Sequence, residues 1–183
     1  ANIQIKGDEL GFDLSDRELA AKITDVVKQR EMDGYSYESA DASFELLIRD
    51  ETGQLDKQFD VQKWRVLTSD QVTDEGDSEA TVKVRVNGDV TTRVGEGQGP
   101  INALDKALRS ALKKTYPAVE GFELTDYRVR ILESAHGTDA ITRVLIDTTD
   151  GARTWTTVGV GTNVVEASWE ALHDSYLWGL IER

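Results

Sequence analysis

The stretch Val94-Gly-Glu-Gly-Gln-Gly-Pro-Ile101 decides the fold, because it recurs 64 positions later as Val158-Gly-Val-Gly-Thr-Asn-Val-Val165. In both copies a strand pattern runs into a glycine-rich turn, and an apolar helical stripe follows. The strands further upstream repeat too: Phe59-Asp-Val-Gln-Lys-Trp-Arg-Val66 matches Phe122-Glu-Leu-Thr-Asp-Tyr-Arg-Val129 at an offset of 63. Self-similarity at a fixed spacing is typical of a duplicated supersecondary unit.

Each repeat predicts three strands and one helix. Val82, Val84 and Val86 alternate with polar residues and lead into Asn87-Gly88, a strong signal for a type I′ hairpin turn. The second copy has its hairpin around Asp150-Gly151. We therefore expect an α+β fold in which two βββα units, over 59–114 and 122–180, pair around a pseudo-twofold axis within a domain spanning 55–183.

The residues before this domain, 1–54, predict a helical linker. Ser15 and Glu18 have the spacing of a capping box, so a helix is expected over about 16–30, ending near Gly34. A second short helix is expected over 40–49, before Gly53. Because such short helices bury little apolar surface alone, they should pack on the rest of the chain or on a part that is missing. The acidic stretch over 70–79 is read as a solvated hairpin loop, without the spacing of an EF-hand.

Composition excludes several classes of function. The 34 acidic and 21 basic side chains give a net charge of −13, which argues against nucleic-acid binding and against an anionic membrane surface. No apolar run is long enough to cross a bilayer. The absence of Cys fits a reducing cytoplasm and removes thiolate chemistry.

No catalytic or metal-binding constellation is predicted either. The only two histidines are His136, in a polar turn expected at the surface, and His173, on the last helix without a partner at a recognisable spacing. Trp169, Leu172, Tyr176 and Leu180 fall near one helix face and are interpreted as core or subunit contact.

The two glycine-rich turns are the best local candidates for a ligand site. Each precedes a helix start, where free N–H groups and the helix dipole favour a carboxylate or a phosphate. Neither turn has the spacing of a dinucleotide-binding fingerprint or of a P-loop. The alternative is that the glycines only make tight strand-to-helix turns. Duplication favours a ligand, because two symmetry-related helix starts would face each other.

Several long segments resemble the C-terminal region of the 2-isopropylmalate, homocitrate and citramalate synthase family. The glycine-turn segment ending at Arg109 is similar to the family's G-N-G-P-x-x-A-x-x-x-A-L motif, with Gln98 in place of the usual Asn. Asp126–Leu132, Thr142–Ile146, Trp155–Val160 and Asn163–Trp169 resemble its regulatory domain, and Tyr35–Leu47 resembles its linker helices. The similarity covers nearly the whole chain and is greatest to the citramalate synthase branch.

This resemblance implies a non-catalytic regulatory fragment. The family's catalytic TIM barrel, with its H-x-H divalent-metal ligands and its acyl-CoA chemistry, would precede this chain, which begins Ala-Asn-Ile and has Met32 as its only methionine. No cofactor is expected in the fragment itself. The family's C-terminal domain is a dimer that binds the end-product amino acid and feeds back on the barrel. The implied partners are therefore isoleucine or leucine, a second copy of the chain and the missing barrel.

The expected effector site combines the glycine turns with the first strand of the second unit. The backbone N–H groups of the first turn would bind the carboxylate, and apolar side chains would hold the aliphatic chain. The ammonium partner stays open, with Asn163 or an acidic residue as possibilities. The predicted contacts are Gly97, Gln98, Gly99, Pro100, Ile101, Leu124, Tyr127, Ile131, Ile141, Val144, Gly161 and Asn163.

The leading hypothesis is thus an allosteric amino-acid-binding and dimerisation domain that gives feedback inhibition of a citramalate synthase by isoleucine. The first alternative is a leucine-sensing domain of a 2-isopropylmalate synthase. The second is a purely structural dimerisation module that binds no effector. One methylene in an apolar pocket separates ligands by only about 1–3 kcal/mol, so residue types do not decide between leucine and isoleucine.

Overall fold

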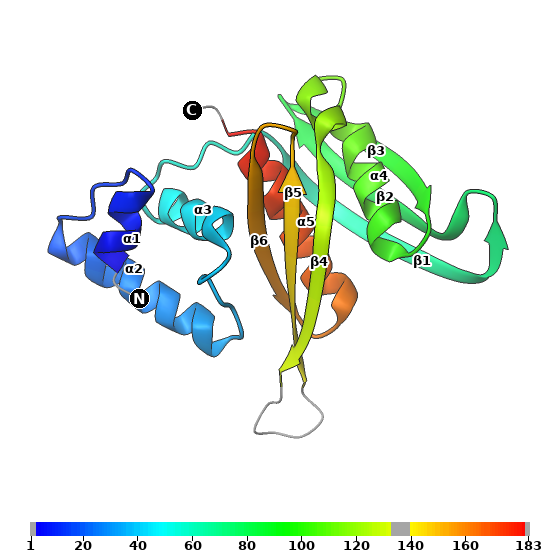
Figure 1. Ribbon diagram of the computed structural model, residues 1–183. Coiled ribbons are helices and arrows are strands. Elements are labelled where there is room, and N and C mark those ends of the chain that lie inside the picture. Colours follow the sequence, from blue (N-terminus) through cyan, green and yellow to red (C-terminus); the bar gives the residue numbers. More distant parts are fainter. Residues whose placement is uncertain (1–2, 133–139, 182–183) are drawn as a thin grey trace.

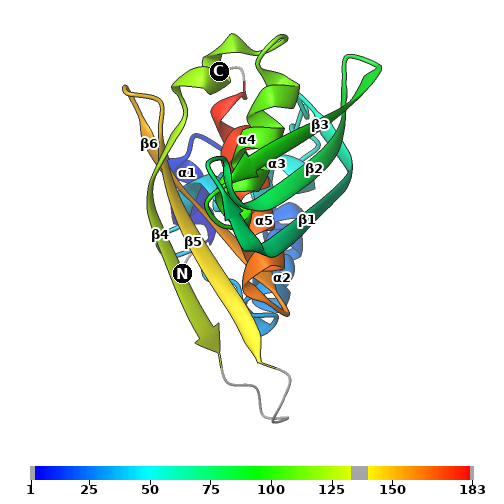
Figure 2. The same ribbon diagram turned by 90° about the vertical axis from the view of Figure 1, so that its right-hand side faces the viewer.

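The computed structural model describes residues 3–132 and 140–181, arranged as successive layers (Figure 1). The N-terminal helices lie against one face of a three-stranded sheet, and two long helices separate that sheet from a second three-stranded sheet. The view turned by 90° shows the two sheets on opposite sides of the helices (Figure 2). The α+β fold with two strand-strand-strand-helix units is confirmed.

The elements of each unit follow in the same order. The first unit contains β1 (Asp60–Thr73), β2 (Gly76–Val86), β3 (Asp89–Gly97) and α4 (Pro100–Leu112). After the short 3-10 helix η1 (Pro117–Gly121), the second unit contains β4 (Glu123–Leu132), β5 (Ile141–Thr149), β6 (Thr154–Gly161) and α5 (Val164–Gly179). Both sheets are antiparallel meanders, ordered β1-β2-β3 and β4-β5-β6.

The two sheets share their register residue for residue. Val82 pairs with Trp64 and Arg93, and the equivalent Ile146 pairs with Tyr127 and Thr157. Both first strands also carry a register shift at the same place, between Val61 and Lys63 and between Leu124 and Asp126. The duplication read from the sequence therefore extends to the irregularities of the backbone.

Two glycines let each helix lie directly on its sheet. A Cβ on Gly95 would come within 2.5 Å of the Ala103 carbonyl oxygen, and one on Gly159 within 1.9 Å of the Ala167 carbonyl oxygen. Ala103 and Ala107, like Ala167 and Ala171, are fully buried at these crossings. These glycines therefore have a structural role at the tight turns, because they allow the helices to pack close to the strands.

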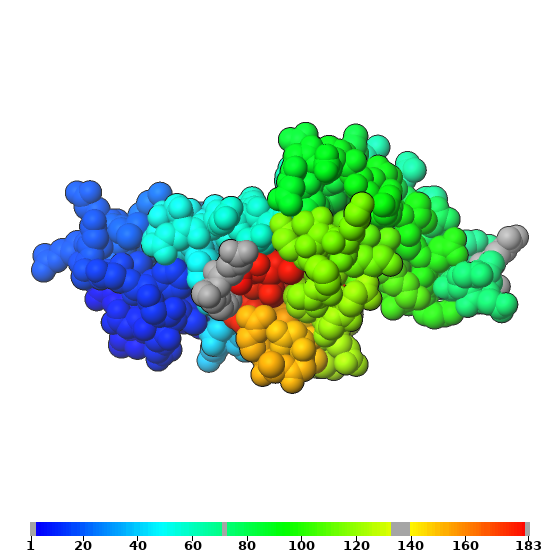
Figure 3. Space-filling view, turned by 90° about the horizontal axis from the view of Figure 1, so that it is seen from above, coloured from blue at the N-terminus to red at the C-terminus, as the bar shows by residue number. Residues whose placement is uncertain are grey.

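The linker comprises α1 (Ile3–Glu9), α2 (Arg17–Met32) and α3 (Asp41–Glu51). Most of its buried apolar residues form one cluster that includes Val158 of β6 and packs against Leu145, whereas Ala42 and Leu46 join the core between the two sheets. Ser43 accepts a hydrogen bond from the Val158 backbone N–H at 2.8 Å, and the Arg143 guanidinium donates to the Gly34 carbonyl at 2.7 Å. The linker helices therefore pack on the outer face of the second sheet. From above, the molecule extends from the linker at one end to the first unit at the other (Figure 3).

Three local predictions differ from the structure. Helix α1 was not anticipated. Asp16, rather than a Ser15–Glu18 box, caps α2, accepting hydrogen bonds from the backbone N–H groups of Glu18 and Leu19. The acidic stretch over 70–79 is mostly strand, because β1 continues to Thr73 and β2 begins at Gly76. Asn87 and Gly88 both have positive φ, as the hairpin turn requires.

Candidate functional site

A cleft of about 510 Å³ opens where the first unit meets the second, and we call it the cross-unit cleft. One wall is the start of α4, and the other consists of β4 and the start of α5, so both helix N-termini converge on it. Its floor is mostly apolar. The lining residues are Gln98 to Asn102, Asp105, Arg109, Phe122 to Leu124, Tyr127, Val164 and Val165.

The polar wall of the cleft is a network around Asp105. Its carboxylate accepts hydrogen bonds from Arg109, one helical turn away, and from the Tyr176 hydroxyl of α5 at 2.6 Å. Burial raises the pKa of Tyr176, which keeps its hydroxyl a neutral donor. Only 15% of the Asp105 side chain is exposed, so α4 presents a fixed carboxylate to the cleft.

The glycine turn at the start of α4 already has acceptors for two of its N–H groups. The Gln98 backbone N–H donates to the Asn102 side-chain oxygen at 3.2 Å, and the Gly99 N–H donates to Asp77 at 2.8 Å. The Gly99 N–H lowers the pKa of Asp77 in return. An incoming carboxylate would thus meet the NH₂ of Asn102, whose oxygen faces the turn, more readily than free backbone N–H groups.

The structure brings about half of the predicted contacts together. Gln98, Gly99, Pro100, Ile101, Leu124 and Tyr127 line the cleft. Tyr127 is 40% exposed, and its hydroxyl hydrogen-bonds Ser168 of α5. Gly97 lies just outside, packed so closely that a Cβ would come within 2.2 Å of the Asn102 side-chain oxygen.

The other predicted contacts lie elsewhere. Ile131 is 66% exposed, further along β4, and Val144 is fully buried beneath α5. Asn163 caps α5 by accepting from the Glu166 backbone N–H, and Gly161 packs against that helix. Ile141 lies away from the cleft. It faces Gly34 of the linker, because alternate residues of β5 point to opposite faces of the sheet.

Sequence reasoning missed Asn102, Asp105 and Arg109 as parts of the site. Their spacing along α4 places them on one helix face, which the sequence does show. Nothing in the sequence, however, tells that this face meets β4 of the other unit. His136 lies outside the described residues.

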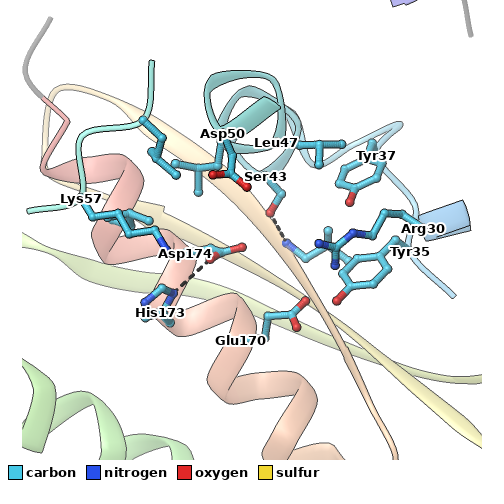
Figure 4. Close-up of a pocket in the computed structure, with 14 residues that line it drawn as sticks. Arg30, Tyr35, Tyr37, Ser43, Leu47, Asp50, Lys57, Glu170, His173 and Asp174 are labelled. Carbon is cyan, nitrogen blue, oxygen red and sulfur yellow. Dashed lines mark hydrogen bonds and ion pairs between the residues drawn. The ribbon is translucent and has the colours of Figure 1, made fainter. Parts of the chain in front are cut away.

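A second cavity, of about 250 Å³, lies between the linker and α5, and we call it the linker cavity (Figure 4). Tyr35 and Arg30 come from the linker side, and Glu170, His173 and Asp174 from α5. The Tyr35 hydroxyl faces the Glu170 carboxylate (Figure 4), and the Arg30 guanidinium lies 5.1 Å from the centre of the Tyr35 ring. Burial raises the pKa of Glu170 and of Tyr35. The cavity therefore lies at the contact between the linker and the second unit, and polar side chains from both line it.

His173 has a carboxylate neighbour that the sequence analysis did not identify. Its Nδ1 lies 3.1 Å from Asp174, and its ring packs edge-on against Phe59. Over residues 3–132 and 140–181, no group of three or more His, Asp or Glu side chains is placed to hold a metal ion. Among the helices of those residues, none is long and apolar enough to cross a membrane.

Comparison with known proteins gives a consistent picture. Residues 38–177 match the family model described as the LeuA allosteric (dimerisation) domain. An (R)-citramalate synthase of Streptomyces coelicolor is 52% identical over 99% of the chain. An (R)-citramalate synthase of Aquifex aeolicus is 43% identical over the full length of the chain. A 2-isopropylmalate synthase of Shewanella woodyi is more distant, at 28% identity over 93% of the chain.

The chain spans about one third of the length of these relatives, with 34% and 35% of the two citramalate synthases covered and 30% of the isopropylmalate synthase. The duplicated units, the linker packed on the second sheet and the match over 38–177 agree. The chain therefore belongs to the LeuA allosteric (dimerisation) domain family.

Proposed function

We propose that this chain binds the end-product amino acid, isoleucine, in the cross-unit cleft and thereby gives feedback inhibition of an (R)-citramalate synthase. The observation that carries the proposal is the convergence of two helix N-termini on an apolar cleft that also holds a fixed carboxylate. A free α-amino acid needs these features: an apolar pocket, a donor for its carboxylate and an acceptor for its ammonium.

The apolar floor suits an aliphatic side chain. Ile101 and Leu124 are half-buried, Val164 is 39% exposed, and all three line the cleft. Burying four carbons of a branched chain against such surface stabilises a complex by about 3 kcal/mol, at roughly 0.8 kcal/mol per methylene. This contribution is enough for selection of an aliphatic amino acid over a polar one.

The polar groups of α4 suit the charged end of the ligand. Asn102 and Asp105 are three residues apart, so their side chains lie on one helix face about 5 Å from each other. The Asn102 NH₂ and the positive helix end would bind the carboxylate, while Asp105 would accept from the ammonium. This assignment fills the role of ammonium acceptor, which the sequence left open.

The proposal includes a homodimer that covers the rest of β4. From Tyr127 in the cleft onward, the same strand leaves Tyr127, Val129 and Ile131 exposed at 40%, 43% and 66%. These side chains all point to the face where α5 covers β5 and β6 but not β4. A second copy seated on this strip would bury it and close the open side of the cleft.

The parent enzyme is proposed from the relatives. Their names describe (R)-citramalate synthases, and they are about three times as long as this chain. The acyl transfer and its divalent metal would therefore reside in a barrel outside these residues. Effector binding to this domain would control the activity of that barrel.

Isothermal titration calorimetry tests the effector role. Isoleucine should bind in the micromolar range, and Asp105→Asn or Tyr127→Ala should weaken binding at least ten-fold. Lys83→Ala is the matched control, because Lys83 is exposed on β2 of the first unit between the buried Val82 and Val84, and therefore lies on the face away from α4. Its titration should resemble that of the unmodified chain.

Either of two outcomes would contradict the proposal and support an alternative function. Tighter binding of leucine than of isoleucine would support a leucine sensor of the 2-isopropylmalate synthase type. A folded dimer that gives no heat with any branched-chain amino acid would support a purely structural dimerisation module.

A further inference from the structure

The duplicated fold contains a second interface equivalent to the cross-unit cleft. In the cleft, β4 of the second unit meets α4 of the first; in the second interface, β1 of the first unit meets α5 of the second. Residues around this second interface line a groove of about 450 Å³. Six equivalent positions line both hollows: 60 and 123, 61 and 124, 64 and 127, 102 and 166, 105 and 169, and 109 and 173.

The side chains at three of these positions differ sharply. Trp64 replaces Tyr127 on the strand, and Trp169 and His173 replace Asp105 and Arg109 on the helix. The rings of Trp64 and Trp169 stack, with centroids 5.3 Å apart and an interplanar angle of 27°. Trp169 is only 9% exposed, so its indole fills the space between strand and helix.

The groove left beside this stack is chemically unlike the cleft. It is walled by charged side chains, among them Asp60, Lys63, Glu166 and Glu170. The two stacked indoles occupy the space between strand and helix, so the groove beside them has proportionally less apolar lining than the cleft. The carboxylate that Asp105 supplies in the cleft is also absent at position 169.

We propose that the indole of Trp169, stacked on Trp64, occupies in the second interface the place that the amino acid occupies in the cross-unit cleft. Each chain therefore carries one effector site, although its fold supplies two equivalent positions. This inference rests on the proposed function, since it takes the cleft as the effector site. It assigns to Trp64 and Trp169 the role of setting ligand stoichiometry.

The stoichiometry of the unmodified chain is the first test. Titration with isoleucine should give one site per chain. Two sites per chain would overturn the inference while leaving the proposed function intact. No binding at all would instead overturn the proposed function, so the two failures are distinguishable.

A graft tests the role of the tryptophans directly. W64Y/W169D/H173R gives the second interface the three residues of the cleft, and it should add a second binding event, weaker than the first by ten-fold or more because the glycine turn of the second unit differs. The smaller graft W64Y/W169D retains His173 and should show the same second event. A variant with native circular dichroism that still binds a single isoleucine would contradict the inference.

The reverse graft removes the site from the cleft. Y127W/D105W/R109H should lower isoleucine affinity at least a hundred-fold while keeping the secondary structure, because the paired indoles would take the place of the ligand. Unchanged affinity in the folded variant would show that the equivalent positions do not share a binding role.

Discussion

The first and second units have the same backbone register but different surroundings. The second sheet is covered on both faces, by α5 on one side and by the linker on the other, whereas the first sheet is covered only by α4 and leaves Lys63, Arg65 and Lys83 exposed on its outer face. The cross-unit contacts differ in the same way: one is filled by tryptophans and the other is an open cleft. The duplication thus gives both units the same backbone, and the side chains at equivalent positions determine whether the cross-unit contact is filled or open.

The largest loss of stability is expected at the glycines where helix and strand pack closely in both units. Gly159→Ala would drive a Cβ into the backbone of α5, at 1.9 Å from the Ala167 carbonyl oxygen, and should lower the free energy of unfolding by about 3 kcal/mol. Gly95→Ala, with its shortest contact at 2.5 Å, should cost less. Urea unfolding at fixed protein concentration measures both.

Gly121→Ala is the control for this pair, because its Cβ would meet only one atom, at 4.0 Å. If Gly159→Ala were as stable as Gly121→Ala, the close helix–strand packing described above would be wrong.

The next effect separates the two cross-unit interfaces. Trp64→Ala removes half of the indole stack and should lower the free energy of unfolding by about 2–3 kcal/mol. Tyr127→Ala, at the equivalent position, removes a side chain that is 40% exposed and should cost about 1 kcal/mol. Equal losses in urea unfolding would mean that the second interface is not the more tightly packed one.

A smaller effect concerns the linker, which covers only the second sheet. Ser43→Ala leaves the buried N–H of Val158 without its acceptor and should cost about 1–2 kcal/mol. The control is Ser39→Ala, at an exposed position of the same segment, which should be neutral. A neutral Ser43→Ala in thermal unfolding would argue against the docking of α3 on β6.

The smallest effect is a pH dependence at the linker cavity. Because burial raises the pKa of Glu170 in the folded chain, the folded state holds its proton more tightly than the unfolded state. The contribution of Glu170 to stability is thus greatest at low pH and is lost as the pH rises from about 4.5 through the folded pKa. Glu170→Gln, which has no charge at any pH, should remove this loss.

The check is thermal unfolding of both chains between pH 4 and pH 7. The stability of Glu170→Gln relative to the unmodified chain should increase with pH. A difference that stays constant over this range would show that Glu170 is not buried as described.

The sequence predicts the backbone of the duplicated units well because their signals are local. Alternation at Val82, Val84 and Val86, the Asn87-Gly88 turn and the proline at the start of α4 each act over a few residues, and a fixed offset repeats them. Helix α1 escaped prediction because it is short and its apolar residues gain from burial only against α2 and the loop around Phe12 and Leu14.

The candidate site is harder to predict because it lies between the units. Asp105 and Arg109 look like an ordinary surface pair on a helix, and only the approach of β4 and Tyr176 turns them into a wall of a cleft. The position of Ile141 is hard to predict for a related reason: its side chain lies against Gly34 of the linker, on the opposite face of the sheet from the cleft. Long-range packing, rather than residue type, decides both cases.

A crystal structure of the chain grown with isoleucine would show directly where the amino acid binds. One ligand per chain should lie in the cross-unit cleft, with its ammonium on Asp105, its carboxylate at Asn102 and an undisturbed Trp64–Trp169 stack. Ligand density beside the tryptophan stack or in the linker cavity, with the cross-unit cleft empty, would contradict this expectation.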